Sequence, residues 1–274
     1  DYAYTLHGWL KGVNSSTLSA AFDMGKDGAT GSTVATDAFG YSLHYYGNND
    51  YKPIGGNVVL GRGVTSNPLY NGNIGAMAVN IAGIDKPLLY NYRYDVLNRL
   101  VGMKAATGLN ANTNTWAPVA TNDFAENIVY DGNGNIQSYS RNGNGATGKL
   151  EMDKMAYKYR PGTNQLDNIT DSVPSGNYFS DIDTQVPQNY RYDAIGNMIS
   201  DSTSNIRGIG WNVYGKIRYI AKAGVDTIFY TYDAAGNRVS KTAGGIETWY
   251  VRDATGNILS IYTKNDPAHH ARHT

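Results

Sequence analysis

The chain has 274 residues with 23 basic and 23 acidic side chains, so its formal net charge at neutral pH is zero. This balance argues against charge-driven binding to nucleic acid or to an anionic membrane surface. Cysteine is absent, which excludes a disulfide framework, a thiol nucleophile and a cysteine-built zinc site. No apolar run reaches the roughly 18 residues that a membrane-spanning helix needs. Nucleic acid is therefore not an expected partner, and no membrane span is expected.

The composition favours an all-β protein with many tight turns. Charged residues make up 17% of the chain and the mean hydropathy is −0.45, so uncharged polar residues supply most of the polarity. Glycine (32) and asparagine (29) are the commonest residues, and tyrosine (23) far outnumbers phenylalanine (5) and tryptophan (4). Glycine and asparagine accept positive φ in turns, and tyrosine suits a half-buried strand surface. Disorder and a helical bundle are both excluded as the main state.

In chain order, the sequence divides into three parts. Residues 1–89 carry no clean repeat and are predicted to form an N-terminal pre-repeat β region. Residues 90–262 form a predicted array of β-hairpins. Residues 263–274 are predicted to be a mobile tail. Within the array, the segment TGLNANTNTWAPVATND from Thr107 and the segment RNGNGATGK from Arg141 are predicted to be loops inserted on the sheet.

An internal repeat runs through the second part. The clearest copies share one pattern, which is Tyr-x-Tyr-Asp-x-x-Gly-Asn-x-x-Ser. They read YRYDAIGNMIS from Tyr190 and YTYDAAGNRVS from Tyr230, with YVRDATGNILS from Tyr250 and IVYDGNGNIQS from Ile128 close behind, and weaker copies start at Tyr92, Tyr157 and Ile209. The aspartate position of the pattern falls at residues 95, 131, 160, 193, 212, 233 and 253. The spacing approaches 20 residues toward the C-terminus, which is the length of two average strands and two turns.

One unit is predicted to be an antiparallel β-hairpin. Tyr230 and Tyr232 alternate with Thr231, so both rings lie on one face of a strand. Asp233 then opens a turn, because its carboxylate accepts N–H groups from the following backbone, and Gly236 supplies the positive-φ residue of a bulged type I turn. A single hairpin is unstable in water, so the units are predicted to pair laterally into one continuous sheet.

The repeated pattern resembles the YD repeat of the RHS proteins, a family that includes bacterial polymorphic toxins, shell-forming components of insecticidal toxin complexes, and teneurins. The segments DYAYTLHGWLKGVN and YYGNNDYKPIGG resemble the sequence before such repeats in Bacteroidetes-type members. The resemblance implies an all-β repeat array of hairpins that forms a curved ribbon, part of an RHS-type cocoon or shell around a polypeptide cargo. The self-cleavage motif of many bacterial members is not matched, since the one Asp-Pro step, Asp266-Pro267, is followed by AHHARHT.

The repeated aspartates are interpreted as structural. Asp131, Asp193, Asp233 and Asp253 occupy one equivalent position, where a carboxylate braces a turn, whereas catalysis needs one special site. DGNGN from Asp131 starts like a calcium loop but lacks the glycine and the glutamate that such a loop needs at its sixth and twelfth positions, which are Ile136 and Asn142. It is therefore predicted to be a hairpin turn.

The histidines offer no preorganised site. They are His7, His44, His269, His270 and His273. The last three are predicted to lie in the terminal tail, where metal binding would be adventitious. No HExxH, GxSxG, Walker A or GxGxxG pattern occurs in the sequence. No catalytic, cofactor-binding or metal-binding residue is assigned, and no cofactor is expected.

These observations predict a structural protein that is not an enzyme. The expected role is an encapsulating segment of a larger secreted or surface protein of the bacterial polymorphic-toxin type. Its expected partners are the rest of the parent shell or an enclosed polypeptide, with self-association through edge strands. The main alternative is a secreted carbohydrate-binding or adhesive module that stacks glycans on an exposed tyrosine face. A hydrolase assembled from non-adjacent acids is a third reading.

Overall fold

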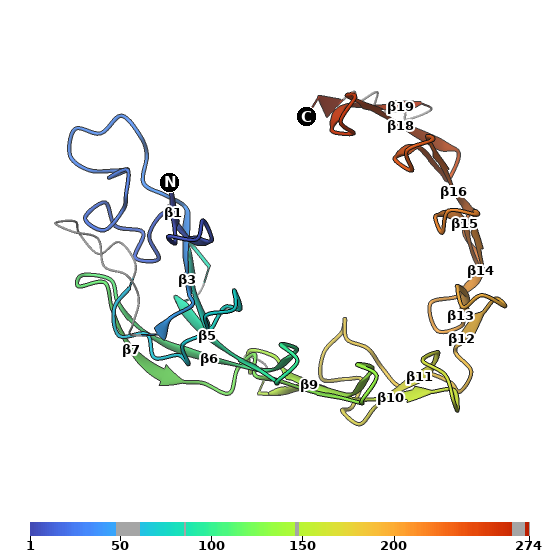
Figure 1. Cartoon of the computed structure of the whole chain (residues 1–274), viewed down its shortest axis with the longest axis horizontal. Helices are drawn as coiled ribbons and strands as arrows, with labels where there is room; N and C mark the ends of the chain where they lie inside the picture. Colours follow the sequence, from blue (N-terminus) through green and yellow to red (C-terminus); the bar gives the residue numbers. More distant parts are fainter. Residues whose placement is uncertain (48–60, 85, 146–147, 265–271, 274) are drawn as a thin grey trace. The chain divides into compact units, whose positions relative to one another are not determined.

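The fold is built from strands and turns. The computed structural model describes residues 1–47, 61–84, 86–145, 148–264 and 272–273. Within these ranges there is no helix, and hence none that is long and apolar enough to cross a membrane. The predicted all-β class, with antiparallel hairpins in series, is confirmed (Figure 1).

The strands pair with their neighbours in sequence order, but they form two sheets, so the prediction of one continuous sheet was wrong. In the first sheet the order is β1-β2-β3-β4-β5-β6-β8-β9-β10-β11, with β7 paired on β6, and in the second it runs from β12 to β20. The strands of the first sheet are β1 (Tyr2–Tyr4), β2 (Leu10–Val13), β3 (Phe39–His44), β4 (Ala76–Ile81), β5 (Leu88–Tyr94), β6 (Leu100–Asn110), β7 (Thr115–Ala120), β8 (Glu126–Tyr130), β9 (Ile136–Asn142), β10 (Glu151–Tyr159) and β11 (Leu166–Asp171). Those of the second sheet are β12 (Tyr190–Tyr192), β13 (Met198–Asp201), β14 (Ile206–Trp211), β15 (Ile217–Lys222), β16 (Ile228–Tyr232), β17 (Arg238–Ala243), β18 (Ile246–Arg252), β19 (Ile258–Lys264) and β20 (Arg272–His273).

The chain forms two compact units. Unit 1 comprises Asp1–Met155 and Asp171–Ile182, and unit 2 comprises Ala156–Thr170 and Asp183–Thr274. Strands β10 and β11 contribute residues to both units.

The insertion from Thr107 is a hairpin, and the prediction of a loop was wrong. Strand β6 continues to Asn110, and β7 returns along it, with Ala106 opposite Ala120 and Leu109 opposite Trp116. The register shift between Thr107 and Leu109 is a bulge around Gly108. The asparagine-rich stretch is therefore only the turn between two strands.

This insertion completes the hydrophobic core of unit 1. Leu89 on β5 is fully buried, and Trp116 on β7 is 2% exposed. They share one cluster with small residues from neighbouring strands. That cluster consists of Val64, Ala76, Ala78, Leu89, Ala106 and Trp116. Alanines on β4 and β6 leave room for the large Leu89 and Trp116 side chains, so the packing alternates small and large residues.

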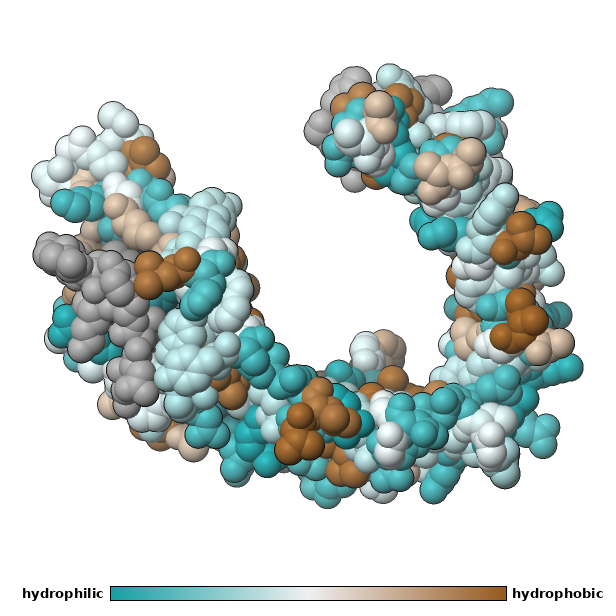
Figure 2. All heavy atoms as spheres, viewed as in Figure 1, coloured by the Kyte–Doolittle hydropathy of each residue, from teal (hydrophilic) through white to brown (hydrophobic). Residues whose placement is uncertain are grey.

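In unit 2 the buried side chains are mostly polar. Ser200, Ser240 and Ser260 are buried at the serine position of the three clear repeats in this unit, and Ser240 shares a hydrogen bond with Thr231 at 2.7 Å. On the face in view in Figure 2, hydrophobic side chains form small separate groups among hydrophilic ones. In unit 2, strand pairing and the hydrogen bonds of the turns therefore determine much of the fold, rather than a large hydrophobic core.

Candidate functional site: the repeated turns and two side-chain clusters

The turn at Asp233 has the predicted geometry. The Asp233 carboxylate accepts the backbone N–H of Asn237 at 2.8 Å and its side-chain N–H at 3.1 Å. The N–H of Gly236 bonds the carbonyl of Asp233 at 3.1 Å, and Gly236 has φ = 82°. The strand register shifts between Thr231 and Tyr232, as a bulge requires. The predicted bulged type I turn is confirmed.

The other aspartates repeat this arrangement. The carboxylates of Asp131, Asp193 and Asp253 each accept the backbone N–H four residues on, at 2.8, 2.8 and 2.9 Å. Each also accepts the side-chain N–H of that asparagine, at 2.9 to 3.0 Å. The DGNGN segment is thus a hairpin turn, as predicted. In the degenerate copy, Asn212 serves the same purpose, accepting the N–H groups of Tyr214 and Lys216 at 3.0 and 2.9 Å.

These bonds favour the ionised carboxylates. The pKa values of all five repeat aspartates lie below the ordinary range. The hydrogen bond from the asparagine side chain is the largest cause for Asp131, Asp233 and Asp253. For Asp193 the largest effect is desolvation, which acts in the opposite direction, but the hydrogen bonds from Asn197 and its neighbours outweigh it. The shared geometry makes these residues turn braces.

The lowered pKa values predict a loss of stability in acid. A carboxyl group whose pKa is lower in the folded state stabilises the fold above its ordinary pKa, and this contribution is lost as the pH falls. We expect a nearly constant melting temperature between about pH 7 and pH 5, and a progressive fall below about pH 4. Thermal melts followed by circular dichroism across this range test the expectation. The control is a variant in which Asp131, Asp193, Asp233 and Asp253 are all replaced by asparagine, which already occupies the turn position at Asn212. Its melting temperature should fall less steeply in acid than that of the wild type. An equally steep fall would contradict the assignment of these aspartates as turn braces.

The tyrosine immediately before the turn position joins one repeat to the preceding one. The Tyr130 hydroxyl donates to the carbonyl of Leu100 at 2.9 Å, and that of Tyr232 donates to the carbonyl of Ile217 at 2.9 Å. In both cases the acceptor is the first strand residue after the preceding turn. The same bond joins Tyr192 to Leu166 at 3.0 Å. We call these bonds the inter-repeat tethers.

Other donors replace tyrosine in the degenerate copies. Trp211 precedes the turn at Asn212, and its indole N–H donates to the carbonyl of Met198 at 2.9 Å. Arg252 precedes the turn at Asp253, and its Nε donates to the carbonyl of Arg238 at 3.2 Å. Tyrosine, tryptophan and arginine all carry a donor at the end of a long side chain. The position therefore requires a hydrogen-bond donor rather than an aromatic ring.

Arginine guanidinium groups cover some of the tyrosine rings. Arg99 lies 4.6 Å from the ring centroid of Tyr130, and Arg160 lies 5.2 Å from that of Tyr192. Both arginines belong to the preceding turn, so the cation contacts also cross from one repeat to the next. The prediction that the tyrosine rings lie on one strand face was incomplete, because it did not include the hydrogen bonds that their hydroxyl groups donate.

A separate aromatic cluster lies near the N-terminus. Trp9 stacks on His7 with ring centroids 5.2 Å apart, and Tyr46 stacks on Trp9 at 6.5 Å and on Tyr70 at 5.4 Å. Tyr70 is 66% exposed. Tyr45 is buried beneath, 5.4 Å from Trp9. We call His7, Trp9, Tyr46 and Tyr70 the aromatic row. None of these rings belongs to the repeat copies between residues 90 and 262.

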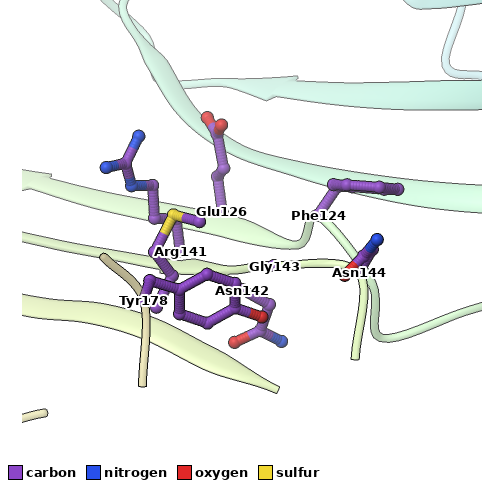
Figure 3. A pocket seen from close by; sticks show the side chains of 8 residues that line it. Phe124, Glu126, Arg141, Asn142, Gly143, Asn144 and Tyr178 are labelled. Carbon is purple, nitrogen blue, oxygen red and sulfur yellow. The ribbon is translucent and has the colours of Figure 1, made fainter. Parts of the chain in front are cut away.

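A cavity of about 400 Å³ opens beside strands β8 and β9 (Figure 3). Glu126 and Arg141 line it, and Arg141 forms an ion pair with the buried carboxylate of Asp153. Burial, followed by the charge of Glu126, raises the pKa of nearby Tyr139 to about 12. The Arg141 guanidinium group is thus paired with the buried carboxylate of Asp153. An ion pair of this kind neutralises a buried charge, which is a structural role.

Two groups of aspartates bring their carboxylates together. In the first, Asp153, Asp171 and Asp181 offer oxygens within 4.8 Å of one another. Asp153 is paired with Arg141 and accepts the N–H of Ile182 at 3.4 Å. This group therefore already contains a cation.

The second group, Asp1, Asp23 and Asp27, lies beside Asp37. Burial, followed by the charge of Asp23, raises the pKa of Asp37. Sequence reasoning missed both groups, because their members are far apart in the chain or lie in a segment without a repeat.

The histidines do not converge in the part of the chain that the structure describes. His7 is exposed in the aromatic row, whereas His44 is buried with Nε2 2.9 Å from the Ser42 hydroxyl. His269 and His270 lie outside the described residues, as does most of the predicted tail. His273 belongs to the short strand β20, which pairs with β19.

Comparison with known proteins gave partial structural likeness only. No protein-family model and no curated protein matches the chain. Among solved structures, the crystal structure of TcdB2-TccC3 is 18% identical, with a TM-score of 0.33, covering 87% of this chain and 11% of that one. TcdB2-TccC3-Cdc42 gives 17% identity and a TM-score of 0.33, with coverages of 88% and 11%. The Photorhabdus luminescens Tc holotoxin pore gives 14% identity and a TM-score of 0.29, with coverages of 82% and 14%. This chain thus spans about a tenth of the length of these proteins.

Proposed function

We propose that this chain is a non-catalytic structural segment of an RHS-type shell, within a larger secreted or surface protein of the bacterial polymorphic-toxin type. The observation that carries the proposal is the set of inter-repeat tethers. A side-chain donor at one fixed position of a repeat bonds the backbone of the preceding repeat, and three donor types fill that position. The feature that all these copies share is therefore the hydrogen bond between neighbouring repeats, as expected of a shell built from repeated units.

The state of the acidic side chains supports a non-catalytic role. Each repeat aspartate uses its carboxylate oxygens inside its own turn, as Asp193 does with Ile195 and Asn197. Such bonding favours the charged, hydrogen-bonded carboxylate. A general acid or base would need a proton-accepting or proton-donating group that reaches a substrate.

A face of the second sheet offers contacts to an enclosed polypeptide. In strands, residues directly opposite each other share a face. Phe229 lies opposite Thr242, and Thr242 lies opposite Glu247, so these residues share one face of the sheet. Trp249, two residues after Glu247, and Tyr262, which lies opposite Trp249, are on the same face. Phe229, Trp249 and Tyr262 are exposed, and the repeat tyrosines, being adjacent in sequence, point to the other face. Exposed aromatic side chains in a row suit an apolar, extended polypeptide.

Edge strands provide a second partner surface. Strand β1 pairs only with β2 among the described strands, and its Tyr2 and Tyr4 are exposed. An edge of this kind can accept a strand from the remainder of the shell or from a second copy of the chain. Zero net charge offers little repulsion against such pairing.

The alternative function is glycan binding, and the aromatic row is the observation that favours it. Trp9, Tyr46 and Tyr70 present stacked, partly exposed rings. The repeat tyrosines suit this role less, because their hydroxyls and some of their ring faces are occupied within the array. A glycan-binding site would therefore lie on the aromatic row rather than on the repeats.

Limited proteolysis of the full-length protein that contains this chain tests the proposal. Under native conditions, we expect the shell segment and an enclosed polypeptide to resist a non-specific protease together, and both to be degraded after denaturation. Affinity electrophoresis of the chain in polysaccharide gels provides the second arm. The contrary outcome is that the polysaccharide retards the chain, with the retardation lost in Trp9→Ala and kept in Tyr192→Phe. If, in addition, the full-length protein contains no protected polypeptide, the glycan-binding alternative replaces the shell proposal.

A further inference from the structure

The segment between β2 and β3, residues 14–38, has no strand of its own, yet it buries polar groups. Ser15, Ser16 and Asp23 are all less than a tenth exposed. A connection of this length without secondary structure is unusual in a compact unit. Since few apolar side chains anchor it, polar contacts must hold it in place.

Three carboxylates meet on this segment. Asp23 and Asp27 lie within it and Asp1 precedes β1, and these residues offer carboxylate oxygens within 4.8 Å of one another. Gly25 lies directly beneath them: a Cβ atom there would be 2.1 Å from Oδ2 of Asp1 and 3.2 Å from Oδ1 of Asp27. The absence of a side chain at Gly25 allows the carboxylates to converge.

The Asp23 carboxylate is the second, independent observation. Asp23 is 6% exposed, and its Oδ2 accepts the N–H of Asp27 at 3.1 Å. Its Oδ1 is buried and has no hydrogen-bond partner among the residues that the structure describes. The backbone nitrogen of Asp1 donates to Oδ1 of Asn14 at 2.7 Å, which fixes the start of β1 beside this segment. A buried carboxylate oxygen that lacks a partner is costly unless a cation or a proton meets it.

We propose that Asp1, Asp23 and Asp27 bind a calcium ion, with Asp37 close by as a fourth carboxylate. The ligands are all hard oxygens, which suit Ca²⁺ or Mg²⁺ rather than a transition metal. Ca²⁺ accepts six to eight oxygens in flexible geometry, so loop carbonyls and water can complete its shell, whereas Mg²⁺ demands an octahedron. The ion would fasten the segment 14–38 to the start of β1.

Thermal melting of the whole chain with added cations tests this site. After treatment with EDTA, about 1 mM CaCl₂ should raise the melting temperature by several degrees, and MgCl₂ should raise it less. Asp23→Asn should abolish the calcium response while melting no lower than the wild type in EDTA, because it removes buried charge without changing shape. Calorimetric titration with CaCl₂ gives the stoichiometry, which should be one ion per chain.

Two further variants make the result decisive. Gly25→Ala changes no charge but fills the space below the carboxylates, so it should also lose the calcium response. Asp226→Asn, at an exposed aspartate of unit 2, should keep it. The proposal is overturned if calcium has no effect on the wild type, if magnesium acts equally, or if the calcium response survives in both Asp23→Asn and Gly25→Ala.

Discussion

Replacing Leu89 by alanine is expected to lower the free energy of unfolding by about 2–5 kcal/mol, the cost of a large-to-small change in a rigid core. Leu89 is fully buried, and its neighbours Ala78 and Ala106 are too small to fill the space that it would leave. The loss combines the transfer free energy of the removed methyl groups with the cavity left behind. The effect should be this large because the cluster is the hydrophobic core of unit 1.

Urea unfolding followed by tryptophan fluorescence measures this effect, since Trp116 is buried in the same cluster and reports its exposure. The matched control is Leu97→Ala, at a leucine that is 65% exposed in the turn between β5 and β6. It should change the free energy of unfolding by less than about 0.5 kcal/mol. Equal shifts for the two variants would mean that this cluster does not stabilise unit 1.

The turns could be predicted from the sequence because their causes are local. The aspartate, the residue that accepts positive φ and the asparagine stand within five positions, and the structure joins them by hydrogen bonds within that span, as at Asp253, Gly256 and Asn257. A copy without the motif's glycine still has a positive-φ residue at that position. Asn98 takes the glycine position with φ = 62°, which asparagine tolerates.

The core of unit 1 could not be predicted in the same way. Its completion depends on a backbone pairing between residues distant in sequence, in which the N–H of Trp116 donates to the carbonyl of Arg62 at 2.7 Å and the N–H of Arg62 donates to the carbonyl of Asn114 at 3.0 Å. The asparagine-rich composition around Trp116 indicated a loop. The hairpin β6–β7 was missed for this reason. The pairing with Arg62 could not be predicted either, because local composition contains no information about a partner segment some fifty positions earlier.

The inter-repeat tethers could have been predicted from the sequence. The residue before each turn is tyrosine, tryptophan or arginine, and these share a donor although they differ in aromaticity and charge. Treating the tyrosines only as rings on one strand face concealed this common property. The acidic group at Asp23 is different, since no repeat and no known ligand spacing marks it.

Replacing Gly236 by valine is expected to lower the free energy of unfolding by about 1–3 kcal/mol, the cost of a residue forced into a sparsely populated backbone region. Gly236 has φ = 82°, and a β-branched side chain disfavours this conformation. Steric crowding is not the cause, because a Cβ atom at Gly236 would meet only Cε of Lys216, at 3.5 Å. The measured loss therefore reports backbone strain in the turn.

Two variants separate that strain from the effect of a larger side chain. Ala235→Val places the same valine one position earlier, on an exposed residue without positive φ, and should change the free energy of unfolding by less than about 0.5 kcal/mol. Gly236→Asn should retain more stability than Gly236→Val, because asparagine already occupies the equivalent position at Asn98. Chemical denaturation of the three variants should therefore rank them Ala235→Val, Gly236→Asn and Gly236→Val in decreasing stability. If Gly236→Val were as stable as Ala235→Val, positive φ would not be what the repeat glycine provides, and the turn rule that unites six of the seven copies would lose its physical basis.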